Sequence, residues 1–284
     1  MTLKILCDSA CDLPESIIAD LGIDVLPIMV IKGEKSYRDK IDISPKEVYD
    51  NMRNGVVYKT AQITPLIFQN KFEELTKDGS SLIYIGFSSE LSSTFQSANL
   101  AKLTLEGENP GVDIEIIDTK AASGGYGFIV NEAGKALKEG KTKEEILEII
   151  DYNIKNIDHI FTVDDIEYLY RGGRVSKTNA VLGGMLNIKP VLEVVDGKLA
   201  VLEKVRGKNK VYKTMVDLME KRAINKDFTD KKIFIFHGDD IEAAEKLKEL
   251  IMEKLGAKDF LISEVGAVIG AHAGPGGLTV FYLK

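Results

Sequence analysis

The amino-acid sequence predicts an α/β protein built from two α/β domains. The first should hold a largely parallel sheet with helices on both faces, and the second a mixed sheet that contains a β-hairpin. Apolar runs of strand length alternate with amphipathic runs of helix length through the first half. Residues 82–87 are almost entirely apolar, which is typical of a strand buried on both faces. Asp196-Gly197 lies between two apolar runs and predicts the hairpin, which a purely parallel sheet would not contain.

The length and composition of the chain fit this fold class. A chain of 284 residues is long enough for two domains, and its 44% hydrophobic and 29% charged residues are typical of a globular protein. The formal net charge of -7 disfavours nucleic acid as a partner and allows at most transient contact with an anionic membrane. The sequence shows neither a signal-peptide pattern nor an apolar run of about 20 residues, so we expect a cytoplasmic protein.

Strands and helices are expected to alternate up to about residue 158. Residues 44–47 and 142–145 have the spacing of a capping box at a helix start, and Asp12 could cap an earlier helix. Repeated strand-helix-strand units favour a parallel sheet. The expected strands cover residues 3–7, 25–31, 82–87 and 114–117, and the expected helices cover residues 14–21, 45–52, 65–77, 92–105, 121–138 and 143–154.

The pattern changes after residue 158, which we take as the boundary between domains 1–158 and 159–284. Residues 191–195 and 199–205 should form the hairpin. Segment 268–277 is too rich in glycine to predict a regular element there. The other expected strands cover residues 159–163, 233–236, 260–264 and 278–283, and helices are expected at residues 165–170 and 176–186.

Two polar segments precede helices in the first half of the chain. Residues 88–96, which include Ser92 and Ser93, follow the buried strand 82–87, so free backbone N–H groups and the helix dipole there favour an anion. Simple helix capping is the competing interpretation. Thr60 lies in a polar loop before another helix and could donate a second hydroxyl, if the two loops adjoin at the carboxyl edge of the sheet. Otherwise Thr60 only ends a connecting loop.

The third polar segment surrounds His272 with glycines. Its flexible backbone could hold the imidazole close to a ligand, or it could be a tight crossover turn with an incidental histidine. The segment runs into a strand and not a helix, which argues against a dinucleotide-binding fingerprint. We expect His237 to be a partly buried structural residue and His159 to lie at the surface.

Two other hypotheses follow from the same residues. A serine hydrolase acting on acyl esters would use Ser92 or Ser93 with His272, although no G-x-S-x-G nucleophile elbow is present. An anion- or nucleotide-binding module would use the glycine-rich segment. Cys7 and Cys11 have no further cysteine or nearby histidine to complete a zinc site, so we expect no metal and treat both as small buried residues.

Basic residues gather between positions 171 and 210. On an acidic protein they could form a docking face for an acidic or phosphate-bearing partner, or only a solvated surface. They are Arg171, Arg174, Lys177, Lys189, Lys204, Arg206, Lys208 and Lys210.

Several motifs, in order along the whole chain, resemble the DegV family of bacterial fatty-acid-binding proteins, the lipid-carrying subunits of fatty acid kinase. Residues 5–14 resemble a D-S-x-x-D-[LV]-P start, Thr60-Ala61-Gln62 resembles T-S-Q-P, and residues 91–98 resemble L-S-G-T-Y-x-S-A. Residues 118–125, 168–176 and 272–276 match similarly.

The resemblance implies a carrier that has no catalytic activity of its own and needs no cofactor. It would bury the chain of one long-chain fatty acid, such as palmitate, stearate or oleate, in a tunnel. The carboxylate would bind near Thr60 and Ser92, with Ser93 and His272 close by.

The resemblance also implies a partner, the catalytic subunit of a fatty acid kinase, which would form the acyl phosphate. Arg174 and Arg206 are candidates for structural pairing or for docking this partner. Ala61, Ile63 and Ser93 depart from the family pattern, and the preferred acyl chain does not follow from the sequence.

Overall fold

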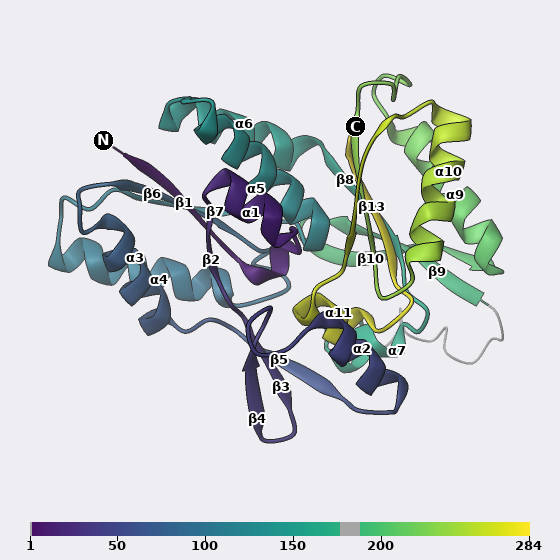
Figure 1. Cartoon of the computed structure of the whole chain (residues 1–284), viewed down its shortest axis with the longest axis horizontal. Helices are drawn as coiled ribbons and strands as arrows, with labels where there is room; N and C mark the ends of the chain where they lie inside the picture. The colour runs from purple at the N-terminus through teal and green to yellow at the C-terminus, as the bar shows by residue number, and fades with distance from the viewer. Residues whose placement is uncertain (1, 177–187) are drawn as a thin grey trace.

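The computed structural model describes residues 2–176 and 188–284, and it confirms the predicted α/β fold class (Figure 1). The described strands are β1 (Leu3–Asp8), β2 (Asp24–Leu26), β3 (Met29–Lys32), β4 (Lys35–Arg38), β5 (Tyr58–Ala61), β6 (Ser81–Gly86), β7 (Ile114–Asp118), β8 (Ile157–Thr162), β9 (Ile188–Val195), β10 (Lys198–Arg206), β11 (Lys232–His237), β12 (Asp259–Glu264) and β13 (Leu278–Leu283). They form a parallel sheet of order β2-β1-β6-β7 and a mixed sheet of order β10-β9-β8-β13-β11-β12. A small antiparallel sheet of order β4-β3-β5 was not predicted.

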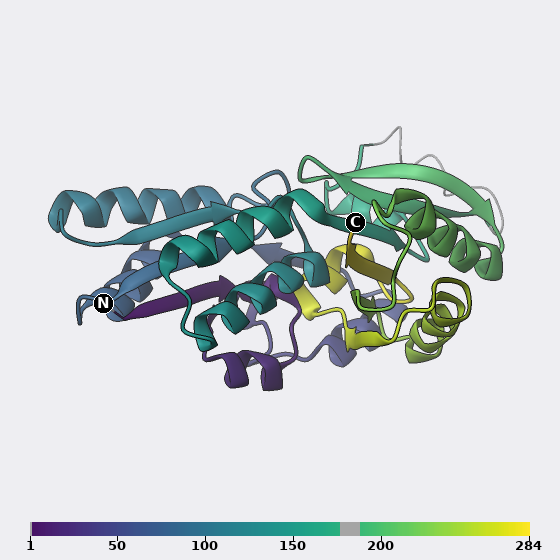
Figure 2. The same cartoon turned by 90° about the horizontal axis from the view of Figure 1, so that it is seen from above.

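Helices cover both faces of the parallel sheet, as predicted (Figures 1 and 2). The described helices are η1 (Ser9–Cys11), α1 (Glu15–Leu21), α2 (Pro45–Arg53), α3 (Pro65–Thr76), α4 (Thr94–Glu108), α5 (Ser123–Lys138), α6 (Lys143–Asn156), α7 (Glu167–Arg171), α9 (Lys208–Arg222), α10 (Ile241–Leu255) and α11 (Ala267–Ala273). α3 and α4 pack against each other along one face, and α1, α5 and α6 lie together on the other. The hydroxyls of Ser44 and Thr142 cap α2 and α6, as predicted from their spacing to Glu47 and Glu145.

The mixed sheet is buried at its centre. β8 lies between β9 and β13, and every residue of β8 is buried. β9 and β10 form the predicted hairpin around Asp196 and Gly197, whose positive φ angles of 48° and 81° are those of a two-residue type I′ turn. The hairpin therefore forms one edge of the mixed sheet.

Helix α5 joins the two large sheets. Its first turn is glycine-rich because side chains there would collide with the mixed sheet: a Cβ on Gly124 would lie 2.6 Å from the Phe281 ring. One turn further, the ring centroids of Phe128 and Phe234 are 5.0 Å apart. Apolar residues of both sheets thus belong to one continuous core. The division into domains 1–158 and 159–284 stays a prediction.

Three predictions in the first half of the chain are wrong. Residues 25–31 form two strands in different sheets, because Pro27 follows β2 and has no N–H to donate to a strand ladder. Thr60 lies on strand β5, where it pairs with Val30 of β3, and not in a loop of the parallel sheet. Asp12 does not cap α1; it adopts a φ of 55°, and its carboxylate accepts a 2.6 Å hydrogen bond from Ser123 Oγ.

The glycine-rich segment 268–277 was predicted to be irregular, but its first half belongs to helix α11. Small residues let this helix approach α2 closely: a Cβ on Gly270 would lie 2.6 Å from the hydroxyl oxygen of Tyr49. The same hydroxyl donates a 2.9 Å hydrogen bond to the carbonyl of Val265. As a result α11 packs against α2, β3 and β5, which brings His272 to the first half of the chain.

No helix among residues 2–176 and 188–284 combines the length and apolar character needed to cross a lipid bilayer. The helix predicted for residues 176–186 lies, apart from Ser176, outside the described residues, as does the basic residue Lys177.

Candidate functional site

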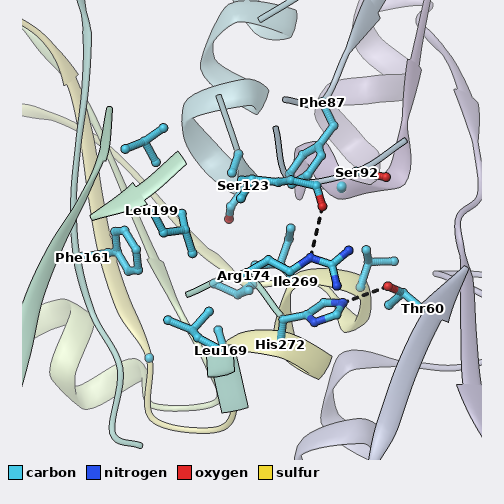
Figure 3. Close-up of a pocket in the computed structure, with 18 of the residues that line it drawn as sticks. Thr60, Phe87, Ser92, Ser123, Phe161, Leu169, Arg174, Leu199, Ile269 and His272 are labelled. Atoms are coloured by element: carbon cyan, nitrogen blue, oxygen red, sulfur yellow. Dashed lines mark hydrogen bonds between the residues drawn. The ribbon is translucent and has the colours of Figure 1, made fainter. Parts of the chain in front are cut away.

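A cavity of about 840 Å³ opens where the parallel, mixed and small sheets meet (Figure 3). Its volume lies within the range of small-molecule binding sites. The four residues predicted to bind a carboxylate, Thr60, Ser92, Ser93 and His272, all line it, and Arg174 does so as well. The structure thus brings together side chains from β5, from the turn before α4 and from α11.

Thr60 and His272 form a hydrogen bond across the small sheet and α11. Thr60 Oγ1 and His272 Nε2 are 2.8 Å apart, although the two residues are 212 positions apart in the chain (Figure 3). Burial, and secondly the positive charge of Arg174, lower the pKa of His272 to about 4, so its ring is neutral at neutral pH.

The direction of this hydrogen bond follows from the other ring nitrogen. Nδ1 of His272 is buried and has no hydrogen-bond partner among the described residues. A proton on Nδ1 would lack an acceptor, so the proton belongs on Nε2, which donates to Thr60 Oγ1. The Thr60 hydroxyl hydrogen is then free to be donated to an anion in the cavity.

Ser92 and Ser93 lie at the positive end of helix α4. Ser92 Oγ accepts a 3.2 Å hydrogen bond from the backbone N–H of Thr94 and lies 2.9 Å from Thr94 Oγ1. Ser93 occupies the N-cap position of α4, is exposed, and makes no side-chain capping bond. The helix dipole therefore adds favourable potential for a negative charge at this end of the cavity.

Arg174 supplies a full positive charge at the same end. Its Nε donates a 3.1 Å hydrogen bond to the carbonyl of Leu91, and its Nη1 donates to the carbonyl of Gly172. Figure 3 shows the guanidinium between the Ser92 loop and His272. Among the described lining residues the acidic side chain is Glu90, which forms ion pairs of 3.3 Å with Lys120 and with Lys198. This end of the cavity is therefore suited to an anion.

The rest of the cavity is largely apolar. Phe161, Leu169 and Leu199 lie on the side away from Thr60 in Figure 3, and Phe87 and Ile269 also line the space. A molecule with an anionic end and an apolar body fits this distribution of side chains.

The geometry does not supply the serine-histidine pair that a hydrolase needs. Among the described residues, Ser92 Oγ is hydrogen-bonded to Thr94 and His272 Nε2 to Thr60. The glycine-rich segment contributes His272 and Gly274 to the same cavity.

His159 was predicted at the surface, and that prediction is wrong. The residue is only 4% exposed, because β8 is a central strand with both faces covered, and its side chain lines the cavity. The strictly local pattern around His159 does not reveal which neighbours β8 has. His237 is buried at a strand end, as expected, where its Nδ1 accepts a 3.2 Å hydrogen bond from the backbone N–H of Asp240.

Some members of the predicted basic cluster form ion pairs with acidic side chains. Lys189 forms a 2.9 Å ion pair with Asp164, and Lys208 forms a 2.6 Å ion pair with Asp240. Arg206 ends β10 and is not among the residues that line the cavity. Of the two arginines singled out from the sequence, only Arg174 lies at the cavity.

Comparison with known proteins places these features in a family. The family model of the DegV family, described as uncharacterised protein, matches residues 2–284. A DegV domain-containing protein of Clostridium perfringens is 42% identical over 282 residues, which cover 98% of this chain and 96% of that protein.

Two solved structures share the fold over the whole chain. One, described as showing fatty acid binding of a DegV family protein from Thermus thermophilus, has a TM-score of 0.90 and 30% identity, with 100% of both chains covered. The other, described as DegV, a fatty acid binding protein from Bacillus subtilis, has a TM-score of 0.86 and 28% identity, also with 100% of both chains covered.

Proposed function

Because this chain belongs to the DegV family, we propose that it binds one long-chain fatty acid in the 840 Å³ cavity and presents the carboxylate to a fatty acid kinase. The observation that carries the proposal is the distribution of side chains: Thr60, Ser92, Arg174 and His272 gather at one end, and apolar side chains line the remainder. The fatty acid binding described for the Thermus thermophilus and Bacillus subtilis proteins supports it.

The polar end suits a carboxylate. In the proposed complex the Thr60 hydroxyl, oriented by His272, donates one hydrogen bond, and the Ser92 hydroxyl donates another. The Arg174 guanidinium neutralises the charge, and such charge-assisted bonds are about twice as strong as neutral ones. The positive end of α4 adds to the same potential.

The apolar part suits an alkyl chain. Burial of a methylene group contributes about 0.8 kcal/mol, so a chain of ordinary length supplies on the order of 10 kcal/mol before the costs of association. This gain is sufficient for tight binding without any covalent step, which is why we propose a carrier without its own catalytic activity.

The carboxylate end is also reachable from a second, smaller cavity. This space of about 210 Å³ shares Thr60, Arg174 and His272 with the main cavity and adds Arg171 to its lining. A kinase that forms an acyl phosphate would have to approach the head group from a side that the alkyl chain leaves free, and this second cavity is such a side.

Mass spectrometry tests the proposal directly. We expect the native protein to carry one fatty acid that dissociates on denaturation and is recovered by organic extraction. The double variant Thr60→Val with Ser92→Ala should retain its fold, as judged by circular dichroism, but lose most of this lipid. Full lipid occupancy in the variant would refute the assigned head-group site, and wild-type protein that takes up neither oleate nor palmitate would refute fatty-acid binding.

The kinase step needs a separate measurement. Fatty-acid-loaded protein, mixed with a bacterial fatty acid kinase subunit and ATP, should yield acyl phosphate, and Arg206→Ala should slow this reaction without lowering lipid occupancy. Equal rates for Arg206→Ala and wild type would exclude Arg206 from docking.

A further inference from the structure

The second cavity, beside the carboxylate site, contains positive charge that fatty-acid binding does not use. This space of about 210 Å³ shares Thr60, Arg174 and His272 with the main cavity. Arg171 lines the second cavity and is not among the residues described as lining the main one. The described part of the chain contributes no acidic side chain to the lining of the second cavity. A positively charged space therefore adjoins the proposed head-group site.

Helix α7 holds Arg171 at this space. The helix ends at Arg171 and packs against α11, which carries His272. The two helices approach closely just after Arg171, since a Cβ on Gly172 would lie only 2.3 Å from His272 Nδ1. Because His272 is hydrogen-bonded to Thr60, the end of α7 is fixed beside the residues proposed to bind the carboxylate.

The guanidinium of Arg171 lies at the second cavity with donors to spare. Its Cζ is 4.8 Å from the ring centroid of Tyr168, which lines the same space. Its Nε is 3.9 Å from Glu167 Oε1, but these side chains are 42% and 48% exposed, and ion pairs of this kind contribute little. The five N–H donors of the guanidinium can therefore serve another anion.

Arg174 brings a second guanidinium to the same space. It lies between the Ser92 loop and His272 (Figure 3), and its bonds to the carbonyls of Leu91 and Gly172 use only part of its five donors. Guanidinium groups bind phosphate with paired hydrogen bonds, which are charge-assisted and strong. Because Thr60 lines both cavities, a phosphoryl group joined to a carboxyl oxygen there can enter the second cavity while the alkyl chain stays in the main one.

We propose that Arg171 and Arg174 form a phosphate-binding subsite in the second cavity, so that the protein holds the phosphoryl group of an acyl phosphate as well as the fatty acid from which it is made. This inference rests on the proposed fatty-acid binding. A phosphoryl group carries about two negative charges at pH 7, and a carboxylate carries one. The added charge faces two guanidinium groups, and the carrier thereby binds the product of the kinase as well as its substrate.

A stable analogue tests the subsite. In 2-oxoheptadecylphosphonate a methylene group replaces the bridging oxygen of palmitoyl phosphate, so the compound resists hydrolysis. Isothermal titration calorimetry of delipidated full-length protein gives the affinities for this phosphonate and for palmitate. Arg171→Gln should lower the phosphonate affinity about tenfold, the ratio that one charge-assisted hydrogen bond provides. The palmitate affinity should stay at the wild-type value, since the alkyl chain and carboxylate occupy the main cavity.

Two further variants separate a specific contact from a general loss of charge. Arg38→Gln is the matched control: Arg38 is an exposed arginine of the small sheet that pairs with Asp42, and it is not among the described residues that line either cavity. This control should keep the wild-type affinity for both ligands. Arg171→Lys retains the charge and should recover part of the phosphonate affinity. Equal losses in Arg171→Gln and Arg38→Gln would overturn a specific role of Arg171.

The outcomes distinguish this inference from the proposed function. Palmitate binding by wild type, together with a phosphonate affinity that Arg171→Gln does not change, would overturn the subsite and leave the fatty-acid carrier intact. Failure of wild type to bind either ligand would overturn both. Inorganic phosphate tests the other source of the same chemistry. If palmitate-loaded protein bound it in an Arg171-dependent way, the site would belong to a separate anion, and the proposal would be wrong.

Discussion

At the scale of single residues, the candidate site depends on a histidine that acts through a threonine. Nδ1 of His272 has no partner among the described residues, so Nε2 donates to Thr60 Oγ1 at 2.8 Å and turns the threonine hydroxyl toward the cavity. Because the pKa of His272 is lowered to about 4, its imidazole is neutral at every pH well above 4 and can orient the Thr60 hydroxyl throughout that pH range.

His272→Leu should therefore weaken fatty-acid binding by about tenfold, since the Thr60 hydroxyl loses the group that orients it. His237→Leu is the matched control. It also removes a buried histidine that makes one hydrogen bond, but that bond joins His237 to the backbone N–H of Asp240 and does not involve Thr60. Isothermal titration calorimetry of the delipidated variants with oleate measures the fatty-acid affinity of each. Equal losses of affinity in the two variants would show that His272 acts only on stability.

Asp12 gives a pH dependence whose sign follows from its burial. Burial raises the pKa of Asp12 from 3.8 to about 7, against the opposing effects of Lys40 and Ser123. Between these two values the native state binds more protons than the unfolded state. The contribution of Asp12 to the free energy of unfolding is therefore fully present below about pH 4 and is lost as the pH rises to about 7.

Asp12→Asn should abolish this contribution, because an amide does not titrate. The difference in unfolding free energy between wild type and variant should shift in favour of the variant from pH 4 to pH 7, by at most about 1.4 kcal/mol per pH unit. Urea titrations at several pH values measure the unfolding free energies of wild type and variant. Asp20→Asn, a substitution at an exposed aspartate, is the control. A difference independent of pH would contradict a raised pKa of Asp12. His159 and His272 titrate in both proteins and cancel in the comparison.

At the scale of elements, the β9–β10 hairpin closes the cavity against the parallel sheet. Leu199 lines the cavity, and the turn before it is fastened by a 2.8 Å hydrogen bond from Ser88 Oγ to the carbonyl of Gly197. Lys198 adds an exposed ion pair with Glu90 at 3.3 Å. Two features of position 197 require glycine. Its φ is 81°, which other residues rarely adopt, and a Cβ there would lie 2.5 Å from Ser88 Oγ.

Gly197→Ala should therefore loosen the hairpin and speed the exchange of bound fatty acid severalfold. Gly207→Ala is a close control, because Gly207 also has a positive φ, of 91°, but a Cβ there meets nothing within 4 Å. Both variants carry backbone strain of about 1 kcal/mol, whereas only the first displaces the turn from Ser88. Dissociation rates of a fluorescent fatty acid compare them, and equal rates would show that the hairpin does not gate exchange.

At the scale of the whole molecule, a ligand in the cavity would link the two large sheets. Phe87 follows the parallel sheet and Phe161 belongs to the mixed sheet, and both line the same space. A bound chain that touches both should stabilise the whole protein, since binding to the native state alone raises the free energy of unfolding.

Oleate at a free concentration of 100 times its Kd should raise this free energy by about 2.7 kcal/mol. The melting temperature should rise by several degrees, and hydrogen exchange should slow in both β6 and β8. Thr60→Val with Ser92→Ala should show a much smaller shift at the same oleate concentration. Protection confined to the parallel sheet would contradict a ligand that contacts both sheets.

The sequence by itself determined the elements whose signals are local. The unbroken apolar run of β6, the capping spacings at Ser44 and Thr142 and the turn chemistry of Asp196-Gly197 each depend on neighbouring residues, and each was predicted correctly. The polar and glycine-rich segments singled out Thr60, Ser92 and His272, and resemblance to a family assigned them to a carboxylate; their roles as ligands stay a proposal.

Only the tertiary structure decided what depends on distant parts of the chain. The small sheet β4-β3-β5 requires partners that periodicity does not reveal, and α11 forms in a glycine-rich segment because Gly270 packs against Tyr49, more than 200 residues earlier. The burial of His159 follows from the central place of β8 in its sheet. The contact of Thr60 with His272, across 212 positions, exists only because α11 docks on β5, and long-range packing of this kind leaves no trace in local patterns.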